Sequence, residues 1–195
     1  MTKRPAPRIY VLAGVNGAGK SSIAGATFRL AGGQYFNLDE AACQQGRRLL
    51  ERAIAERLDY AFESTLVAST LPRLLARAAS EGFEVRVWYA GLSNPELHMA
   101  RVRARVARGG HDIPEADIRR RYEHSRLNLI VLLPHLAALR VYDNSAEADP
   151  AVGQAPRPLL VLHLEHARIM NPRNLAHAPG WARPIVAAAL KGRLA

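Results

Sequence analysis

Residues 14–21 have the glycine spacing of a phosphate-binding loop. They read GVNGAGKS and match the pattern G-x-x-x-x-G-K-[ST]. Glycines let the backbone curl so that successive N–H groups point at phosphate oxygens. A helix that starts at the end of the loop adds the positive end of its dipole. We therefore expect Lys20 to reach the β- and γ-phosphates of a nucleoside triphosphate and the Ser21 hydroxyl to ligate magnesium.

The same pattern predicts ATP with Mg²⁺ as the bound nucleotide. The expected nucleotide-binding residues are Gly14, Asn16, Gly17, Ala18, Gly19, Lys20, Ser21 and Ser22. The flanking sequence supports this prediction. Residues 8–13 (RIYVLA) form a short apolar run typical of a buried parallel strand, and residues 21–30 have apolar side chains at helical spacing.

A carboxylate stands at the end of the next predicted strand, residues 34–38. This is Asp39, which precedes a predicted helix over residues 40–57. A carboxylate beside the phosphate loop is well placed to orient or deprotonate an acceptor hydroxyl, so Asp39 is the candidate catalytic base. The alternative is that Asp39 caps the N-terminus of the helix that follows it.

A second polar cluster lies at the end of the third predicted strand, residues 59–64. Glu63, Ser64 and Thr65 place a carboxylate beside two hydroxyls. Such a group can hold a polar acceptor or a magnesium-bound water, so we expect these residues to bind the substrate. The alternative is that Glu63 only ends the strand and meets a nearby arginine.

Residues 101–126 contain eight arginines against four acidic residues. Guanidinium groups on a closing lid stabilise the charge that spreads over a transferring phosphoryl group. Arg108 and Arg121 are the leading lid candidates because they flank the turn at residues 109–111, and Arg105 and Arg120 are the next. His111 lies in the same turn, where a structural hydrogen bond is the simpler interpretation.

The rest of the chain continues the alternation of strands and helices. Helices are predicted over residues 69–80 and 115–133 and after Asn94-Pro95, where Asn94 is a good N-cap. Further strands are predicted at residues 84–91, 139–142 and 158–166. This alternation predicts an α/β fold with a mostly parallel sheet of about five or six strands, helices on both faces and an arginine-rich helical lid.

In such a sheet the ligand lies at the carboxyl ends of the strands, where the candidate residues are found. The length of 195 residues suits one domain. We expect its core at about residues 8–145, followed by a C-terminal extension over residues 146–195 whose structure the sequence does not define.

The composition of the chain limits which classes of binding partner we expect. A formal charge of +10 favours anionic partners, but aromatic residues make up only 6% and are not interleaved with the basic stretches, so nucleic acid is a weak prediction. The single cysteine, Cys43, suits a reducing cytoplasm. No apolar run reaches the length of a membrane span, so no membrane partner is expected.

Three segments together carry a family resemblance: GVNGAGKSS, FEST and RVARGGHDIPEADIRRRYEHSRLNL. With them, residues 8–145 resemble the zeta-toxin family of P-loop kinases, in particular its stand-alone bacterial branch. The resemblance implies an ATP-dependent kinase that phosphorylates a hydroxyl of a small phosphate-bearing substrate, UDP-N-acetylglucosamine in the best-studied members. It also implies that Asp39 matches the catalytic aspartate and that an antitoxin protein can be a partner. Residues 142–145 fall where kinases of this architecture hold the nucleobase, although a simple turn explains them equally well.

Two other functions stay open at this point. A nucleic-acid 5′-hydroxyl kinase would use the same loop and aspartate with a basic channel for the strand. A nucleotide-gated binding module would bind the triphosphate with little turnover.

Overall fold

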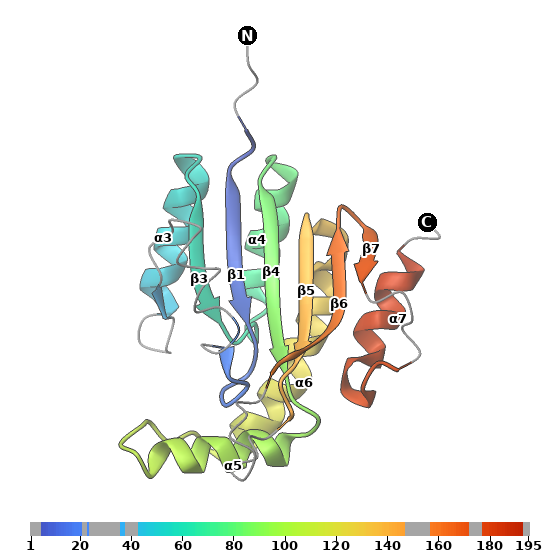
Figure 1. Cartoon of the computed structure of the whole chain (residues 1–195). Coiled ribbons are helices and arrows are strands. Elements are labelled where there is room, and N and C mark those ends of the chain that lie inside the picture. The colour runs from blue at the N-terminus through green and yellow to red at the C-terminus, as the bar shows by residue number, and fades with distance from the viewer. Residues whose placement is uncertain are drawn as a thin grey trace.

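The computed structural model describes residues 5–20, 23, 36–37, 43–146, 157–171 and 177–192. Within this part of the chain, seven strands form one sheet in the order β2-β3-β1-β4-β5-β6-β7 (Figure 1). The strands are β1 (Arg8–Ala13), β2 (Phe36–Asn37), β3 (Tyr60–Ser64), β4 (Glu84–Gly91), β5 (Ala138–Asp143), β6 (Leu159–Glu165) and β7 (Arg168–Asn171).

The first five strands of the sheet are parallel, and β6 and β7 continue it in antiparallel pairing. The prediction of a mostly parallel α/β sheet is therefore confirmed. Strand β7 is an addition that the sequence did not indicate. It follows β6 through a tight turn in which His166 and Ala167 have φ angles of 45° and 60°. Such turns are usually signalled by Asn or Gly, and neither residue is present here.

Helices of the described chain cover one face of the sheet. They are α3 (Cys43–Ala55), α4 (Thr70–Ser80), α6 (Glu115–Leu132) and α7 (Arg183–Lys191). Their apolar residues pack against every second residue of the strands, such as Val11 of β1, in one buried cluster. On the helices this cluster includes Leu50, Leu75, Leu129 and Ile185. Helices α3, α4 and α6 match the predicted segments within a few residues, because amphipathic spacing places one apolar stripe against the sheet.

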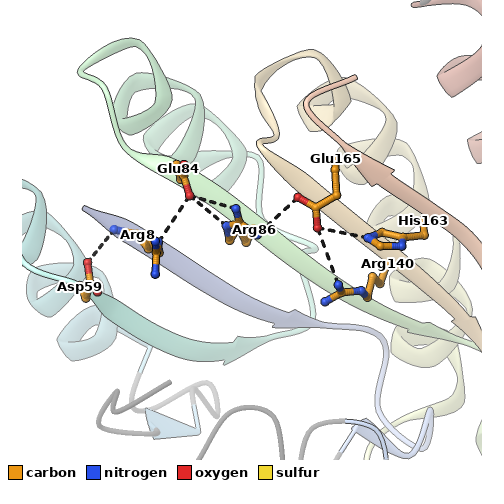
Figure 2. Close-up of polar contacts among 7 residues, drawn as sticks. All are labelled: Arg8, Asp59, Glu84, Arg86, Arg140, His163 and Glu165. Carbon is orange, nitrogen blue, oxygen red and sulfur yellow. Dashed lines mark hydrogen bonds and ion pairs between the residues drawn. The ribbon is translucent and has the colours of Figure 1, made fainter. Parts of the chain in front are cut away.

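The opposite face of the sheet carries a smaller apolar cluster of Leu12, Ala61 and Trp88. Next to it, charged side chains of β1, β4 and β6 form a series of ion pairs across the sheet (Figure 2). Glu84 contacts both Arg8 and Arg86, at 3.5 and 3.0 Å, and Arg86 continues to Glu165. The helix predicted over residues 21–30 falls almost wholly outside the described residues, so helical cover of this face stays a prediction.

Helix α5 (Pro95–Val106) lies across the carboxyl ends of the parallel strands (Figure 1). Its start agrees with the prediction: Asn94 Oδ1 accepts a hydrogen bond from Leu97 N at 2.9 Å, and Pro95 is the first helical residue. Two short 3₁₀ helices, η2 (Leu133–His135) and η3 (Gly180–Ala182), complete the elements. None of the helices in the described ranges combines the length and apolar character that crossing a membrane requires.

Candidate active site

The predicted phosphate loop connects β1 to a helical turn at Lys20, at the carboxyl edge of the sheet (Figure 1). Gly14 N donates to Ser64 O at 3.1 Å, which fastens the loop to the end of β3. Gly17 and Gly19 have φ angles of 80° and 74°, a region that residues with side chains rarely adopt. The glycine spacing is thus required by the curl of the backbone.

Lys20 is buried within the loop, with 8% of its surface exposed. Its Nζ atom donates to Gly14 O at 2.7 Å and lies 3.2 Å from Glu63 Oε1. The ammonium group is therefore held across the mouth of the loop, between its first carbonyl and the carboxylate at the end of β3. Glu63 was predicted to bind substrate; in the structure it contacts the loop lysine.

Asn16 joins the phosphate loop to the two helices that follow β4. Its carbonyl oxygen accepts from His98 Nδ1 of α5 at 2.8 Å, and its side-chain Oδ1 accepts from Arg121 Nη1 of α6 at 2.9 Å. Burial, which is the largest cause, lowers the pKa of His98 to about 4, and the nearby charges of Lys20 and Arg101 lower it further. His98 is therefore neutral at neutral pH and donates through Nδ1–H.

The segment after β5 closes the other side of the loop. Asn144 is buried, and its Nδ2 donates to Ala18 O at 2.9 Å while its backbone N donates to Gly91 O at 3.0 Å. A side chain at Gly19 would overlap Asn144 Nδ2. Asn144 thus packs directly on the loop backbone, and this contact gives Gly19 a steric role besides its positive φ.

A cavity of about 440 Å³ opens beside the loop, between α3, α4, α6 and the end of β3. Asn16 borders it on the loop side, and Ser64 and Thr65 line it after β3. Its apolar wall includes Leu50 and Phe62. Its basic rim consists of Arg47, Arg120, Arg121 and His124. The cavity therefore combines hydroxyl groups, an apolar wall and positive charge next to the predicted phosphate position.

The four arginines predicted for the lid occupy different places. Arg121 is buried against Asn16, and Arg120 is exposed on the cavity rim, where it pairs with Asp117 at 2.7 Å. Arg105 and Arg108 lie near the turn after α5, where Arg105 Nη2 donates to His111 O at 2.7 Å and Arg108 is exposed. Arg105 and Arg108 thus lie apart from the other two. Of these four arginines, Arg120 and Arg121 are the ones that line the cavity.

Three of the predicted site residues lie outside the described residues. They are Asp39, Ser21 and Ser22. Their roles as base, magnesium ligand and nucleotide contact stay predictions. Across the described ranges, no group of three or more His, Cys, Asp or Glu side chains is arranged to hold a metal ion.

Sequence reasoning did not single out His98 or the loop contact of Asn144. His98 follows the N-cap Asn94 by about one turn and has Met99 and Val102 beside it on the buried side of α5. A histidine in such an apolar stripe has no local signal that marks a loop contact. Asn144 was named only as part of a segment that could flank a nucleobase.

Comparison with known proteins agrees with this fold. A chain of the AvrRxo1-ORF1:-ORF2 complex with ATP superposes with a TM-score of 0.63 at 13% identity, over 94% of this chain and 64% of that one. A chain of the PezAT toxin–antitoxin system of Streptococcus pneumoniae gives 0.54 at 16% identity, over 72% and 69%. A chain of the Pnkp1/Rnl/Hen1 RNA repair complex gives 0.50 at 17%, over 65% and 46%.

Comparison of sequences gives a match over a smaller part of the chain. No protein-family model matches the chain. An uncharacterized protein of Haemophilus influenzae is 35% identical over 74 residues, which are 38% of this chain and 53% of that protein. The match thus spans about half the length of this curated relative.

The fold and the loop define the class: this chain has the fold of the P-loop kinases, with a phosphate loop at the carboxyl edge of a mostly parallel sheet. Within that class its fold is zeta-toxin-like, which confirms at the level of fold the resemblance that the sequence motifs indicated.

Proposed function

We propose that this protein is an ATP- and Mg²⁺-dependent kinase that transfers the γ-phosphoryl group to a hydroxyl of a small, phosphate-bearing substrate. The observation that carries the proposal is the cavity beside the loop. It is bordered by Asn16 of the loop, by the hydroxyls of Ser64 and Thr65 and by Arg121 of α6. An acceptor in this cavity would lie next to the terminal phosphate of a nucleotide on the loop, as in-line transfer requires.

Nucleotide binding follows from the loop itself. Lys20 lies across the loop mouth, where a β- or γ-phosphate would replace its contacts with Gly14 O and Glu63. The likeness to the ATP-containing AvrRxo1-ORF1:-ORF2 complex supports ATP as the nucleotide. Magnesium, when bound, neutralises charge on the β- and γ-phosphates. Ser21 would hold it, and Glu63, a hard oxygen donor beside Lys20, fits the ligand preference of this ion.

The rim of the cavity supports an anionic acceptor. Arg47, Arg120, Arg121 and His124 surround it, and guanidinium groups are well suited to phosphate oxygens. The apolar wall formed by Leu50 and Phe62 would pack against a base or sugar face. UDP-N-acetylglucosamine, the acceptor that the zeta-toxin resemblance implies, has both parts and is the first substrate to test.

In this proposal Asp39 is the base that orients or deprotonates the acceptor hydroxyl. Arg121, already at the loop, and Arg120 would stabilise charge on the transferring group. Arg105 and Arg108 would join only if the segment between α5 and α6 closes over the site.

Partners and organisation are part of the same proposal. The likeness to a chain of the PezAT toxin–antitoxin system supports an antitoxin protein as a partner. We also propose that residues 1–195 form one P-loop kinase domain that acts in the cytoplasm.

A nucleic-acid 5′-hydroxyl kinase is the second candidate. The formal charge of +10 and the likeness to a chain of an RNA repair complex favour it. The cavity of about 440 Å³ beside the loop has the size of a small-molecule site and favours the small-molecule acceptor.

The test is a transfer assay with γ-labelled ATP, Mg²⁺ and a panel of nucleotide sugars, nucleosides and 5′-hydroxyl oligonucleotides. Label on a nucleotide sugar is the expected result. Label on oligonucleotides, with binding that weakens steeply as salt rises, would support the second candidate. ATP binding without transfer to any acceptor in the panel would favour the binding module.

A further inference from the structure

The C-terminal segment, residues 177–192, is anchored to the sheet by Trp181. This side chain is 5% exposed and lies in the main buried cluster with Tyr89 of β4 and Ile185 of α7. Its ring covers Gly91 so closely that any side chain at position 91 would overlap the indole. Trp181 therefore sits at the carboxyl end of β4, the strand that pairs with β1, and β1 leads into the phosphate loop.

The indole N–H of Trp181 fixes the turn after β5. Nε1 donates to Asp143 Oδ1 at 3.3 Å, and the same oxygen accepts from Ser145 N at 3.1 Å and from Ser145 Oγ. Ser145 Oγ in turn accepts from Ser93 N at 2.8 Å. One carboxylate oxygen thus ties the C-terminal segment to residues 143–145.

Asn144, in the middle of this turn, is the residue that packs on the loop. Its Nδ2 donates to Ala18 O, and it leaves no space for a side chain at Gly19. A shift of the turn would therefore move a donor that holds the loop backbone. Trp181 and Ala18 are linked through two intervening residues, Asp143 and Asn144.

A second route leads from Trp181 to the other side of the loop. Trp181 O accepts from Arg126 Nη1 at 3.3 Å, and the Arg126 guanidinium lies 4.1 Å from the centroid of the Tyr122 ring. The rings of Tyr122 and His98 pack edge to face with their centroids 5.7 Å apart, and His98 donates to Asn16 O. The C-terminal segment is thus connected to both Asn16 and Ala18.

We infer that Trp181 is a positioning residue for the phosphate loop, through which the C-terminal segment sets the affinity for nucleotide. The inference rests on the proposed function, because it takes the loop to be the nucleotide site. Its physical basis is preorganisation: N–H groups that already point at the phosphates need no ordering when the nucleotide binds. Trp181 itself touches no loop residue in these contacts and acts through Asp143 and Arg126.

Trp181→Phe tests the first route, because phenylalanine keeps an aromatic ring over Gly91 and the backbone carbonyl for Arg126 but removes the N–H donor. We expect the Kd for MgATP, measured by titration calorimetry, to rise roughly 3- to 10-fold, the scale of one lost hydrogen bond. KM for ATP should rise in the same proportion, with kcat changed less than about twofold.

Ile185→Val is the matched control. Ile185 is fully buried in the same segment and belongs to neither route. This change should lower Tm by a few degrees, about what a lost buried methyl group costs, and leave the Kd for MgATP unchanged. A control that weakens MgATP binding as much as Trp181→Phe would show a general loss of stability and overturn the inference.

Asn144→Ala completes the design as a double-mutant cycle. If Trp181 acts through Asn144, Trp181→Phe should weaken MgATP binding much less in the Asn144→Ala background than in the wild type. Fully additive effects, or an unchanged Kd in folded Trp181→Phe, would overturn the inference and leave the proposed kinase standing. A folded wild type that does not bind MgATP would instead remove the proposed function and this inference with it.

Discussion

Arg121 Nη1 donates to Asn16 Oδ1 at 2.9 Å, and this contact joins helix α6 to the phosphate loop across 105 residues of sequence. Arg121 is 9% exposed, so its charge is largely removed from solvent. The same side chain lines the cavity beside the loop. A guanidinium in this position can both hold Asn16 and face a transferring phosphoryl group, since its fork has several donors.

Arg121→Lys should therefore reduce phosphoryl transfer by about tenfold or more while it changes ATP affinity far less. Lysine keeps the positive charge but cannot reproduce the planar fork. Steady-state kinetics and titration calorimetry on the same preparation measure the two effects. Equal losses in affinity and turnover would mean that Arg121 only maintains the loop.

Arg108→Ala provides the comparison within the predicted lid. Arg108 is exposed near the turn after α5, so we expect it to affect turnover only through a closed state, with lower kcat and unchanged ATP affinity. Arg73→Ala, at an exposed position of α4, is the charge control and should leave both unchanged. A loss of turnover in the Arg73 variant would indicate a general effect of charge.

Lys20→Ala should abolish ATP binding or turnover without unfolding the protein. The change removes the ammonium that lies at the loop mouth between Gly14 O and Glu63. Circular dichroism and calorimetric titration with MgATP check the two parts of the prediction. Lys191→Ala, at an exposed position of α7, is the matched control. Wild-type affinity and turnover in Lys20→Ala would remove the loop from the mechanism.

Asp39→Asn separates the two interpretations of the predicted base. Asparagine keeps a capping oxygen but loses the basicity of the carboxylate. If Asp39 is catalytic, Asp39→Asn should retain ATP binding and a nearly wild-type melting temperature, but lose about a hundredfold or more in the rate of phosphoryl transfer. A capping Asp39 predicts an active asparagine variant, with about 1 kcal/mol of stability lost only in Asp39→Ala. Melting temperatures and transfer rates of both variants decide between them.

The low pKa of His98 predicts that the stability of the folded protein depends on pH. Its pKa is about 4 in the folded protein, against an ordinary value of 6.5. Between these values the unfolded chain binds more protons, so the free energy of unfolding falls as pH drops from 6.5 toward 4. The difference between the pKa values corresponds to roughly 3 kcal/mol for this buried group.

His98→Asn keeps a donor near Asn16 O but does not titrate in this range. Its free energy of unfolding should therefore depend less on pH below about 6.5, while above that value the two proteins show parallel dependence. Urea denaturation at several pH values measures this difference. The same acid dependence in both proteins would assign it to other groups.

Most of the fold and the loop were predictable because their signals are local. The glycine spacing of residues 14–21 follows from backbone conformation, and the run at residues 8–13 has the apolar pattern of a buried parallel strand. Asn94 and Pro95 mark the start of α5 in two adjacent residues. Strand β7 was missed because its turn uses His166 and Ala167 at positive φ, a conformation that their residue types do not signal.

Local patterns in the sequence are enough to predict the class of fold, the phosphate loop and the arginines that are candidates for a lid. Which of these arginines reaches the loop depends on tertiary packing, because Arg108 and Arg121 flank the same turn and have no distinguishing local pattern. Tertiary packing also brings His98 to Asn16, across 82 residues, and Trp181 to Asp143. Such contacts depend on how distant elements pack, and packing is a property of the whole chain rather than of any short segment.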